Sequence, residues 1–409
     1  MNYAKQVTTV AVILPVLLLS ACSSTTKTQP GVLSNLILEA NNSHVAGQTD
    51  TKEPLPEYLS PYLVENQKSG LRDQVLMNMK AGIASLQQGD YHITRRLMED
   101  AYTRIETLYA NNDAAKAART NYVEEANKDF KGEPYERAMV GYYLGLADML
   151  SGDLQSAKTS FGWGEYQDTM SASENFQSDM SSLIFLRGWA KHCAGEQESA
   201  RADFTASGVN IDASDNVLVL IESGNAPVKY AAGEHGEKLK FKAADEVQNE
   251  TWELVYGNTS FEPIQIEDLV FQASTRGGRP IDAILAGKAK FKDTTKSVAN
   301  GALVGALAAS TYSQSQAYSG DYNSSYNASM VGAALGLVSL FANVMSENTV
   351  PKADTRQWGN LPRFIHGKTF QVNDWQNANQ ITLLGNSTNA ELYPMPTGKC
   401  YLAWHRVDS

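Results

Sequence analysis

The spacing of apolar residues divides the chain into a helical part and a strand-forming part. From about residue 71 to residue 207, apolar residues recur three or four positions apart, which is typical of amphipathic helices. Beyond residue 207, short apolar or alternating runs dominate, and these are typical of strands. The pattern therefore predicts an α+β fold, with a helical N-terminal half and a smaller β-containing half.

Paired glycines reveal a repeat within the helical part. The members of each pair are seven residues apart, and the pairs are Gly82/Gly89, Gly145/Gly152 and Gly188/Gly195. An alanine and an aromatic residue follow in the second and third units, at Ala157/Phe161 and Ala200/Phe204. This spacing predicts tetratricopeptide-like helix pairs, in which one small residue lets two helices touch and another turns the chain. The repeat is irregular, because the second glycines lie 63 and then 43 residues apart.

Helix pairs of this kind stack into a superhelix with a concave groove that commonly holds a partner. The exposed aromatic residues of such a groove are candidates for partner binding, and here they are Tyr142, Tyr143 and Trp163. The alternative is a closed helical bundle in which these three side chains belong to the core.

Eight short runs in the second half predict strands. They cover residues 217–221, 238–241, 251–255, 261–266, 269–273, 364–372, 381–384 and 400–404. Together they predict an antiparallel β unit that a long insertion interrupts.

The insertion, at about residues 282–347, carries small residues every four positions, which lets helices approach closely. The glycines of these stripes are Gly301, Gly305, Gly332 and Gly336. We expect two apolar helices joined by a tyrosine-rich loop. In one interpretation this hairpin is buried against the rest of the fold; in the other it assembles into an oligomer or inserts into a membrane. Each apolar run is shorter than the roughly 20 residues that span a bilayer.

The N-terminus predicts both export and lipidation. Residues 1–21 combine a cationic start with an apolar stretch and small residues before Cys22, which is the pattern of a bacterial lipoprotein signal peptide. Acyl chains on Cys22 would hold the protein on a membrane, since each buried CH₂ contributes about 0.8 kcal/mol. Ser23 and Ser24 follow the cysteine and no aspartate does, which favours the outer membrane, facing the periplasm. Residues 22–61 are polar and predict a tether, followed by a repeat domain at 62–208 and a β-rich domain at 209–409.

Charge and cysteine content narrow the possible partners and links. The formal net charge of −11 argues against a nucleic-acid partner, which would need a basic stripe. Besides Cys22, the chain contains only Cys193 and Cys400. In an oxidising periplasm these two would either pair or remain as simple buried thiols.

The sequence contains no recognisable catalytic motif. The six histidines show no metal-ligand spacing, and neither a P-loop nor a G-x-S-x-G elbow is present. We therefore expect no enzyme activity, no metal and no cofactor, although an enzyme acting on the cell wall would need only a carboxylate held in a cleft. Arg356 and Trp358 form the best site candidate outside the groove, because an arginine beside an indole suits a carboxylate or a sugar face. Alternatively, Arg356 bonds loop carbonyls and Trp358 packs in the interior.

Three sequence blocks, in combination, carry a family resemblance. They are residues 129–137 with the helix that contains Tyr142, residues 217–229, and residues 353–362. The chain is similar in these blocks to a family of uncharacterised bacterial lipoproteins with tetratricopeptide-like repeats. The resemblance implies an envelope location and a helical half followed by a β half, and it implies no reaction.

These observations predict an outer-membrane lipoprotein that acts as an interaction scaffold. The repeat groove would hold an envelope protein partner, and the lipid would keep that partner near the membrane. The alternative is a structural component that forms homo-oligomers, or enters a membrane, through the small-residue hairpin.

Overall fold

The computed structural model describes residues 32–33, 56–110, 129–169, 179–234, 236–244, 251–275, 353–373, 380–385 and 389–407. All of them belong to one compact unit that spans residues 31–409. The predicted signal peptide, Cys22 and most of the tether lie outside the described residues. The predicted hairpin at 282–347, with Gly301, Gly305, Gly332 and Gly336, also lies outside them.

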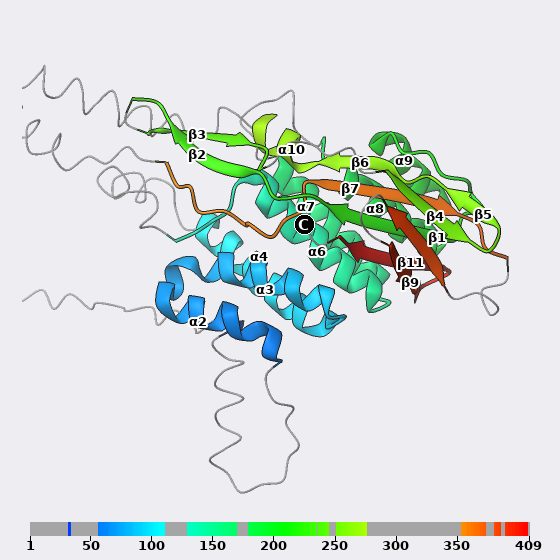
Figure 1. Ribbon diagram of the computed structural model, residues 1–409, viewed down its shortest axis with the longest axis horizontal. Helices are drawn as coiled ribbons and strands as arrows, with labels where there is room; N and C mark the ends of the chain where they lie inside the picture. Colours follow the sequence, from blue (N-terminus) through cyan, green and yellow to red (C-terminus); the bar gives the residue numbers. More distant parts are fainter. Residues whose placement is uncertain are drawn as a thin grey trace, which may run out of the picture. The chain divides into compact units, whose positions relative to one another are not determined.

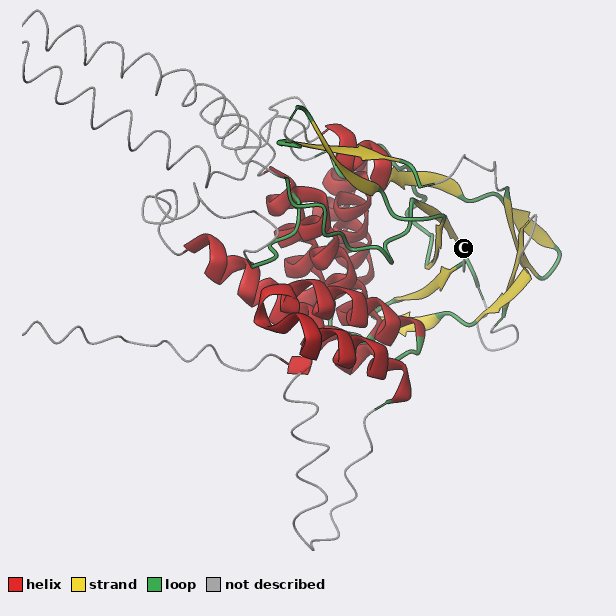
Figure 2. Cartoon of the chain, turned by 60° about the vertical axis from the view of Figure 1, so that its left-hand side comes forward, coloured by secondary structure: helices red, strands yellow, loops and turns green. Residues whose placement is uncertain are grey.

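Helices make up the first half of the described chain, as the apolar spacing predicts (Figure 1). They are η1 (Glu57–Leu59), α2 (Ser60–Ser69), η2 (Gly70–Asp73), α3 (Gln74–Gln87), α4 (Tyr91–Ala110), α6 (Pro134–Leu150), α7 (Leu154–Thr169), α8 (Ser181–Ala194) and α9 (Gln197–Ser207). Figure 2 shows the helices packed side by side, with the strands on one side of them.

The glycine pairs perform the two roles that their spacing predicts, in the helix pairs α3/α4, α6/α7 and α8/α9. Gly145 shows the first role: a Cβ at this position would overlap the ring of Phe161, so the absence of a side chain lets α6 and α7 touch. Gly152 shows the second, because it turns the chain between the same helices at φ 81°, a conformation that favours glycine. Helix pairing is therefore confirmed in all three units.

Strands make up most of the second half, in three sheets. The strands are β1 (Val217–Ser223), β2 (Val228–Ala232), β3 (Lys238–Lys242), β4 (Trp252–Tyr256), β5 (Thr259–Phe261), β6 (Ile264–Asp268), β7 (Phe364–Phe370), β8 (Ile381–Gly385), β9 (Asn389–Leu392), β10 (Met395–Thr397) and β11 (Cys400–Arg406). Their orders are β10-β11-β1-β7-β6, β2-β3 and β5-β4-β8-β9. The prediction of a wholly antiparallel unit is wrong, since β1 and β11 pair in parallel.

Strand β1 lies between two hydrophobic cores, and all seven of its residues are buried. Leu218 and Leu220 face a core that they share with the helices. Val219 and Ile221 face a second core, built with the strands of the four-stranded sheet. This burial on both faces explains why the sequence of β1 is continuously apolar rather than alternating.

One predicted strand is a helix. Residues 269–273 lie in α10 (Leu269–Thr275), because the Asp268 carboxylate accepts a hydrogen bond from the N–H of Val270 at 2.8 Å and so caps a helix N-terminus. The predicted strand at 261–266 is in fact two strands, β5 and β6, separated at Glu262 and Pro263. Residue type alone did not distinguish a short apolar helix from a strand here.

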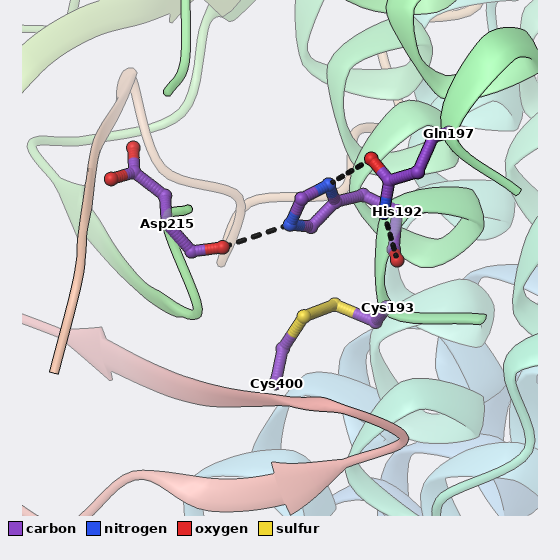
Figure 3. Close-up of a disulfide and its surroundings, with 5 residues drawn as sticks. All are labelled: His192, Cys193, Gln197, Asp215 and Cys400. Atoms are coloured by element: carbon purple, nitrogen blue, oxygen red, sulfur yellow. Dashed lines mark hydrogen bonds between the residues drawn. A yellow bond between two sulfur atoms is a disulfide. The ribbon is translucent and has the colours of Figure 1, made fainter. Parts of the chain in front are cut away.

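A disulfide joins the helices to the five-stranded sheet (Figure 3). It links Cys193, near the end of α8, to Cys400, the first residue of β11, with Cα atoms 5.3 Å apart. The backbone N–H of Lys399 also donates to the Cys193 carbonyl at 3.1 Å. Of the two fates predicted for these cysteines, pairing is the one observed.

Candidate functional site

Three of the predicted partner-binding residues are buried. Tyr142, Tyr143 and Trp358 expose at most 1% of their surface. The Tyr143 and Trp358 rings pack 5.6 Å apart, where helix α6 meets the sheet. These residues therefore build the interior rather than a surface, which corrects the expectation that Tyr142 and Tyr143 line a groove. For Trp358, predicted as part of a site outside the groove, the burial agrees with the alternative of packing in the interior.

Tyr143 belongs to a buried polar network around Glu222 of β1. Its hydroxyl donates to the Glu222 carboxylate at 2.8 Å, and the indole N–H of Trp404 donates to the same carboxylate at 2.8 Å. Arg406 completes the network at 3.3 Å. Burial raises the pKa of Glu222, and the Arg406 guanidinium counteracts part of that rise. The network connects α6, β1 and β11.

Arg356 is held by two carboxylates. It forms ion pairs with Asp354, at 2.6 Å, and with Asp73. Its guanidinium also lies over the ring of Phe130, 5.4 Å from the centroid. This saturation of the guanidinium, together with the burial of Trp358, favours a role within the fold for the Arg356/Trp358 pair over a surface site.

The three sequence blocks of the family resemblance meet at one buried ion pair. Lys229 and Glu136 are joined at 2.6 Å, with side chains exposed by 1% and 0%. The second carboxylate oxygen of Glu136 accepts the backbone N–H of Trp358 at 2.9 Å, and Lys229 donates to the Arg356 carbonyl at 2.9 Å. The sequence positions Glu136 by a capping box, in which its carboxylate accepts the N–H of Glu133 at the start of α6. This cluster fastens the helices to the sheets.

The remaining predicted residue, Trp163, lines an open cleft between α4, α6 and α7. This helical cleft has a volume of about 310 Å³, and its wall includes Arg95, Glu99, Tyr102, Asp148, Thr159 and Trp163. The rings of Trp163 and Tyr102 meet edge to face with centroids 4.5 Å apart. The indole N–H of Trp163 donates to Glu106 at 2.8 Å, which fixes the orientation of the ring.

Asp148 is the most perturbed group of the helical cleft. Its side chain is only 1% exposed. Burial raises its pKa to about 6, against the opposing effects of a hydrogen bond from Ser160 and of the Arg95 charge. Ser160 donates to one carboxylate oxygen at 2.8 Å. The other oxygen lies 3.3 Å from Arg95 Nε and accepts no hydrogen bond within the described part of the chain.

Arg95 divides its charge among three carboxylates. Besides Asp148, its guanidinium contacts Glu99 at 2.9 Å and Asp153 at 3.7 Å. The helical cleft therefore combines aromatic edges with a surplus of negative charge around a single guanidinium. Such a surface suits amide, hydroxyl or cationic groups of a partner, because aromatic faces and carboxylates both attract them.

The sequence prediction missed Arg95, Tyr102 and Asp148. One signal for Asp148 was present: it is the single charged residue in the apolar run 138–150 of α6. No comparable signal marked Arg95 or Tyr102, since charged and aromatic residues are ordinary on a helix such as α4.

Metal binding and membrane crossing find no support in the described part of the chain. Within these residues, no group of three or more His, Cys, Asp or Glu is placed to hold a metal ion. Of the helices that the structure describes, none combines the length and the apolar composition that crossing a bilayer requires.

Comparison with known proteins gives no match: no family model, no curated protein and no solved structure is similar to this chain. The family resemblance and the envelope location consequently stay predictions.

Proposed function

We propose that this protein is a lipid-anchored scaffold of the bacterial outer membrane that holds a partner protein in the helical cleft. The observation that carries the proposal is the edge-to-face pair of Tyr102 and Trp163 beside Asp148, in an open cleft of about 310 Å³. Aromatic residues are enriched at the centres of protein interfaces. The three helix pairs, interpreted as tetratricopeptide-like repeats, support the same role, since such repeats commonly bind partners.

The lipid anchor at Cys22 completes the proposal. Acylation there would restrict the partner to the membrane surface on the periplasmic side. In this proposal the protein catalyses no reaction and needs no cofactor.

Co-isolation of the partner from cells tests the role of the helical cleft. We compare tagged wild-type protein with Trp163→Ala, using Tyr166→Ala as the matched control because Tyr166 lies on the same helix, is 54% exposed and is outside the cleft lining. A discrete envelope protein should accompany the wild type and Tyr166→Ala, and Trp163→Ala should reduce its recovery about tenfold. Equal recovery with both variants would contradict the proposal.

The alternative of self-assembly through the predicted hairpin at 282–347 concerns residues outside the described part. Deleting residues 298–344 separates the two proposals. Partner capture should survive the deletion if the helical cleft is the binding site. Loss of assembly, with no foreign partner before or after the deletion, would favour the structural component.

Asp148 supports a second candidate function, an enzyme acting on cell-wall glycans. A carboxyl group with a pKa raised to about 6 in a cleft has the property of a general acid. Incubation of the protein with purified peptidoglycan tests this candidate. Release of soluble fragments by the wild type, and its absence with Asp148→Asn, would favour the enzyme over the scaffold.

A further inference from the structure

A second cleft lies at the edge of the five-stranded sheet and shares no lining residue with the helical cleft. This sheet-edge cleft has a volume of about 420 Å³. One wall is the turn between α3 and α4 together with the end of α6, and it includes Leu86, Tyr91 and Leu150. The other wall includes Leu392, the last residue of β9 in the four-stranded sheet, and Tyr393, which follows it. The floor is the second half of β11, from Leu402 to Arg406.

The register of β11 shows which peptide groups face this cleft. The N–H of Tyr401 donates to the carbonyl of Asn216, just before β1, at 2.8 Å, and the N–H of Val407 donates to the carbonyl of Glu222 in β1 at 2.9 Å. Since the hydrogen-bonding direction alternates along a strand, the peptide groups of Leu402, Trp404 and Arg406 face away from β1. Strand β10 pairs with β11 only from Cys400 to Leu402. Within the described part of the chain, the outward peptide groups of Trp404 and Arg406 consequently pair with no strand, although β9 lies close to β11.

Pro394 lies where the chain passes from β9, in the four-stranded sheet, to β10, in the five-stranded sheet. Residues 389–392 pair with β8 as strand β9, so they do not continue the ladder along β11. Where β10 does cover β11, Pro396 protects the new outer edge, because proline lacks the N–H that would point outward there. In the described part of the chain, no proline-containing strand pairs with Trp404 and Arg406. Sheets usually blunt such an edge, so an unprotected edge inside a cleft is a candidate docking site.

Apolar side chains frame the unprotected edge. Tyr393 is 64% exposed and Met395 is 40% exposed, and both line the sheet-edge cleft. A strand added beside β11 would point alternate side chains to the two walls, one formed by helices and one by the four-stranded sheet.

We propose that the sheet-edge cleft binds an extended segment of another protein, which adds to β11 as a strand and continues the ladder of β10 over Trp404 and Arg406. The outward peptide groups of Trp404 and Arg406 determine what kind of ligand can bind. An extended backbone offers N–H and C=O groups at the same spacing as these peptide groups. The exposed side chains of Tyr393 and Met395, which line the cleft, favour apolar side chains at alternate positions of the segment. Four residues of β11, from Ala403 to Arg406, are available, which corresponds to about 13 Å of strand. This site is independent of the proposed helical cleft.

Hydrogen exchange at two amides tests the proposal with the full-length protein. The probe is a heptapeptide selected from a display library that has apolar residues at alternate positions. Without peptide, the amides of Trp404 and Arg406 should exchange rapidly; with peptide, their exchange should slow at least about tenfold. Slow exchange of both amides in the protein alone, at any concentration, would overturn the proposal, because a segment of this chain or a second copy would already cover the edge. Failure of every selected peptide to slow the exchange would also overturn it.

Two further variants separate strand addition from simple apolar binding. N-methylation of a peptide amide that faces β11 should weaken binding about tenfold through one lost hydrogen bond, whereas methylation of the next amide should change it far less. Tyr393→Ala should weaken binding, whereas Tyr166→Ala should not; Tyr166 lies on α7 and is 54% exposed, against 64% for Tyr393. Equal effects of the two methylations would show that the peptide binds by its side chains alone and would overturn the proposal.

Discussion

Helix α6 carries two buried acidic residues, which differ in how completely hydrogen bonds and counter-ions surround them. Glu136, at its start, meets the sheets, and Asp148, near its end, meets the helical cleft. Their side chains are 0% and 1% exposed. Glu136 accepts hydrogen bonds from Lys229 at 2.6 Å and from two backbone N–H groups. Asp148 accepts one from Ser160 and shares the Arg95 guanidinium with two other carboxylates.

The difference separates a structural carboxylate from a candidate binding carboxylate. A buried charge is tolerated when its hydrogen bonds and its counter-ion are complete, as they are for Glu136. Burial raises the pKa of Asp148 to about 6, and the Ser160 hydrogen bond and the Arg95 charge oppose this rise only in part, so its charged form lacks stabilisation. A partner that brings a donor or a cation to the helical cleft would supply it.

The largest expected effect comes from breaking the complete pair. Lys229→Met leaves the Glu136 charge buried without its cation and should lower the free energy of unfolding by about 3–5 kcal/mol. Urea denaturation measures the loss. The double variant Lys229→Met with Glu136→Gln should recover much of it, since the uncompensated charge is gone. A single variant as stable as the wild type would contradict the structural role.

Removing the disulfide should cost nearly as much. Cys193→Ser with Cys400→Ser releases a cross-link between residues 207 positions apart, and such losses are about 2–5 kcal/mol. Thermal unfolding with and without reductant measures it. Reductant should destabilise the wild type to the same extent and leave the double variant unchanged. If reductant destabilised the wild type and the double variant equally, the disulfide would not account for the loss of stability.

The contact between α6 and α7, beside the helical cleft, should respond to a single methyl group. Gly145→Ala places a Cβ against the Phe161 ring and should cost about 1–3 kcal/mol. Gly162→Ala is the matched control on α7, because no atom lies within 4 Å of its added Cβ. That variant should gain about 0.5–1 kcal/mol through helix propensity. Equal effects of the two variants would mean that close approach at Gly145 is not required.

Asp148→Asn should have the smallest effect, and the effect should depend on pH. The pKa of Asp148 in the folded protein is about 6, above its ordinary value of 3.8. Between these two pH values the folded state therefore holds a proton that the unfolded state has lost. Wild-type stability therefore falls as pH rises through this range. Relative to the wild type, Asp148→Asn should gain about 2 kcal/mol between pH 4 and pH 7. Parallel stability curves would contradict the raised pKa.

The sequence predicts the elements of this fold better than their contacts. Helix pairing followed from glycine spacing, because a close approach and a left-handed turn each require glycine at a fixed place, as at Gly145 and Gly152. The strand β1 followed from its continuous apolar run. Helix α10 was mistaken for a strand, since seven apolar and small residues fit both structures and the cap at Asp268 decided between them.

The sites were harder to predict, because they depend on residues distant in sequence. Tyr143 looked like a groove aromatic, yet its partner Glu222 lies 79 residues away and draws it into the interior. The helical cleft joins Tyr102 to Trp163 across helices that are not adjacent in the chain. The sheet-edge cleft exists because the chain changes sheets at Pro394, which no local pattern encodes. Of the predicted partner-binding residues, Trp163 borders the helical cleft, whereas Tyr142, Tyr143 and Trp358 are buried.

Photo-crosslinking in intact cells tests the central claim most directly. Thr159 in the helical cleft is replaced by a photoreactive residue, and Thr205 on α9 is the matched control, since both are exposed threonines whose hydroxyls donate to the carbonyl four residues earlier. The account predicts a discrete adduct with a foreign envelope protein from Thr159 and none from Thr205. Adducts only to the protein itself, or equal adducts from both positions, would contradict a partner-binding role for the helical cleft.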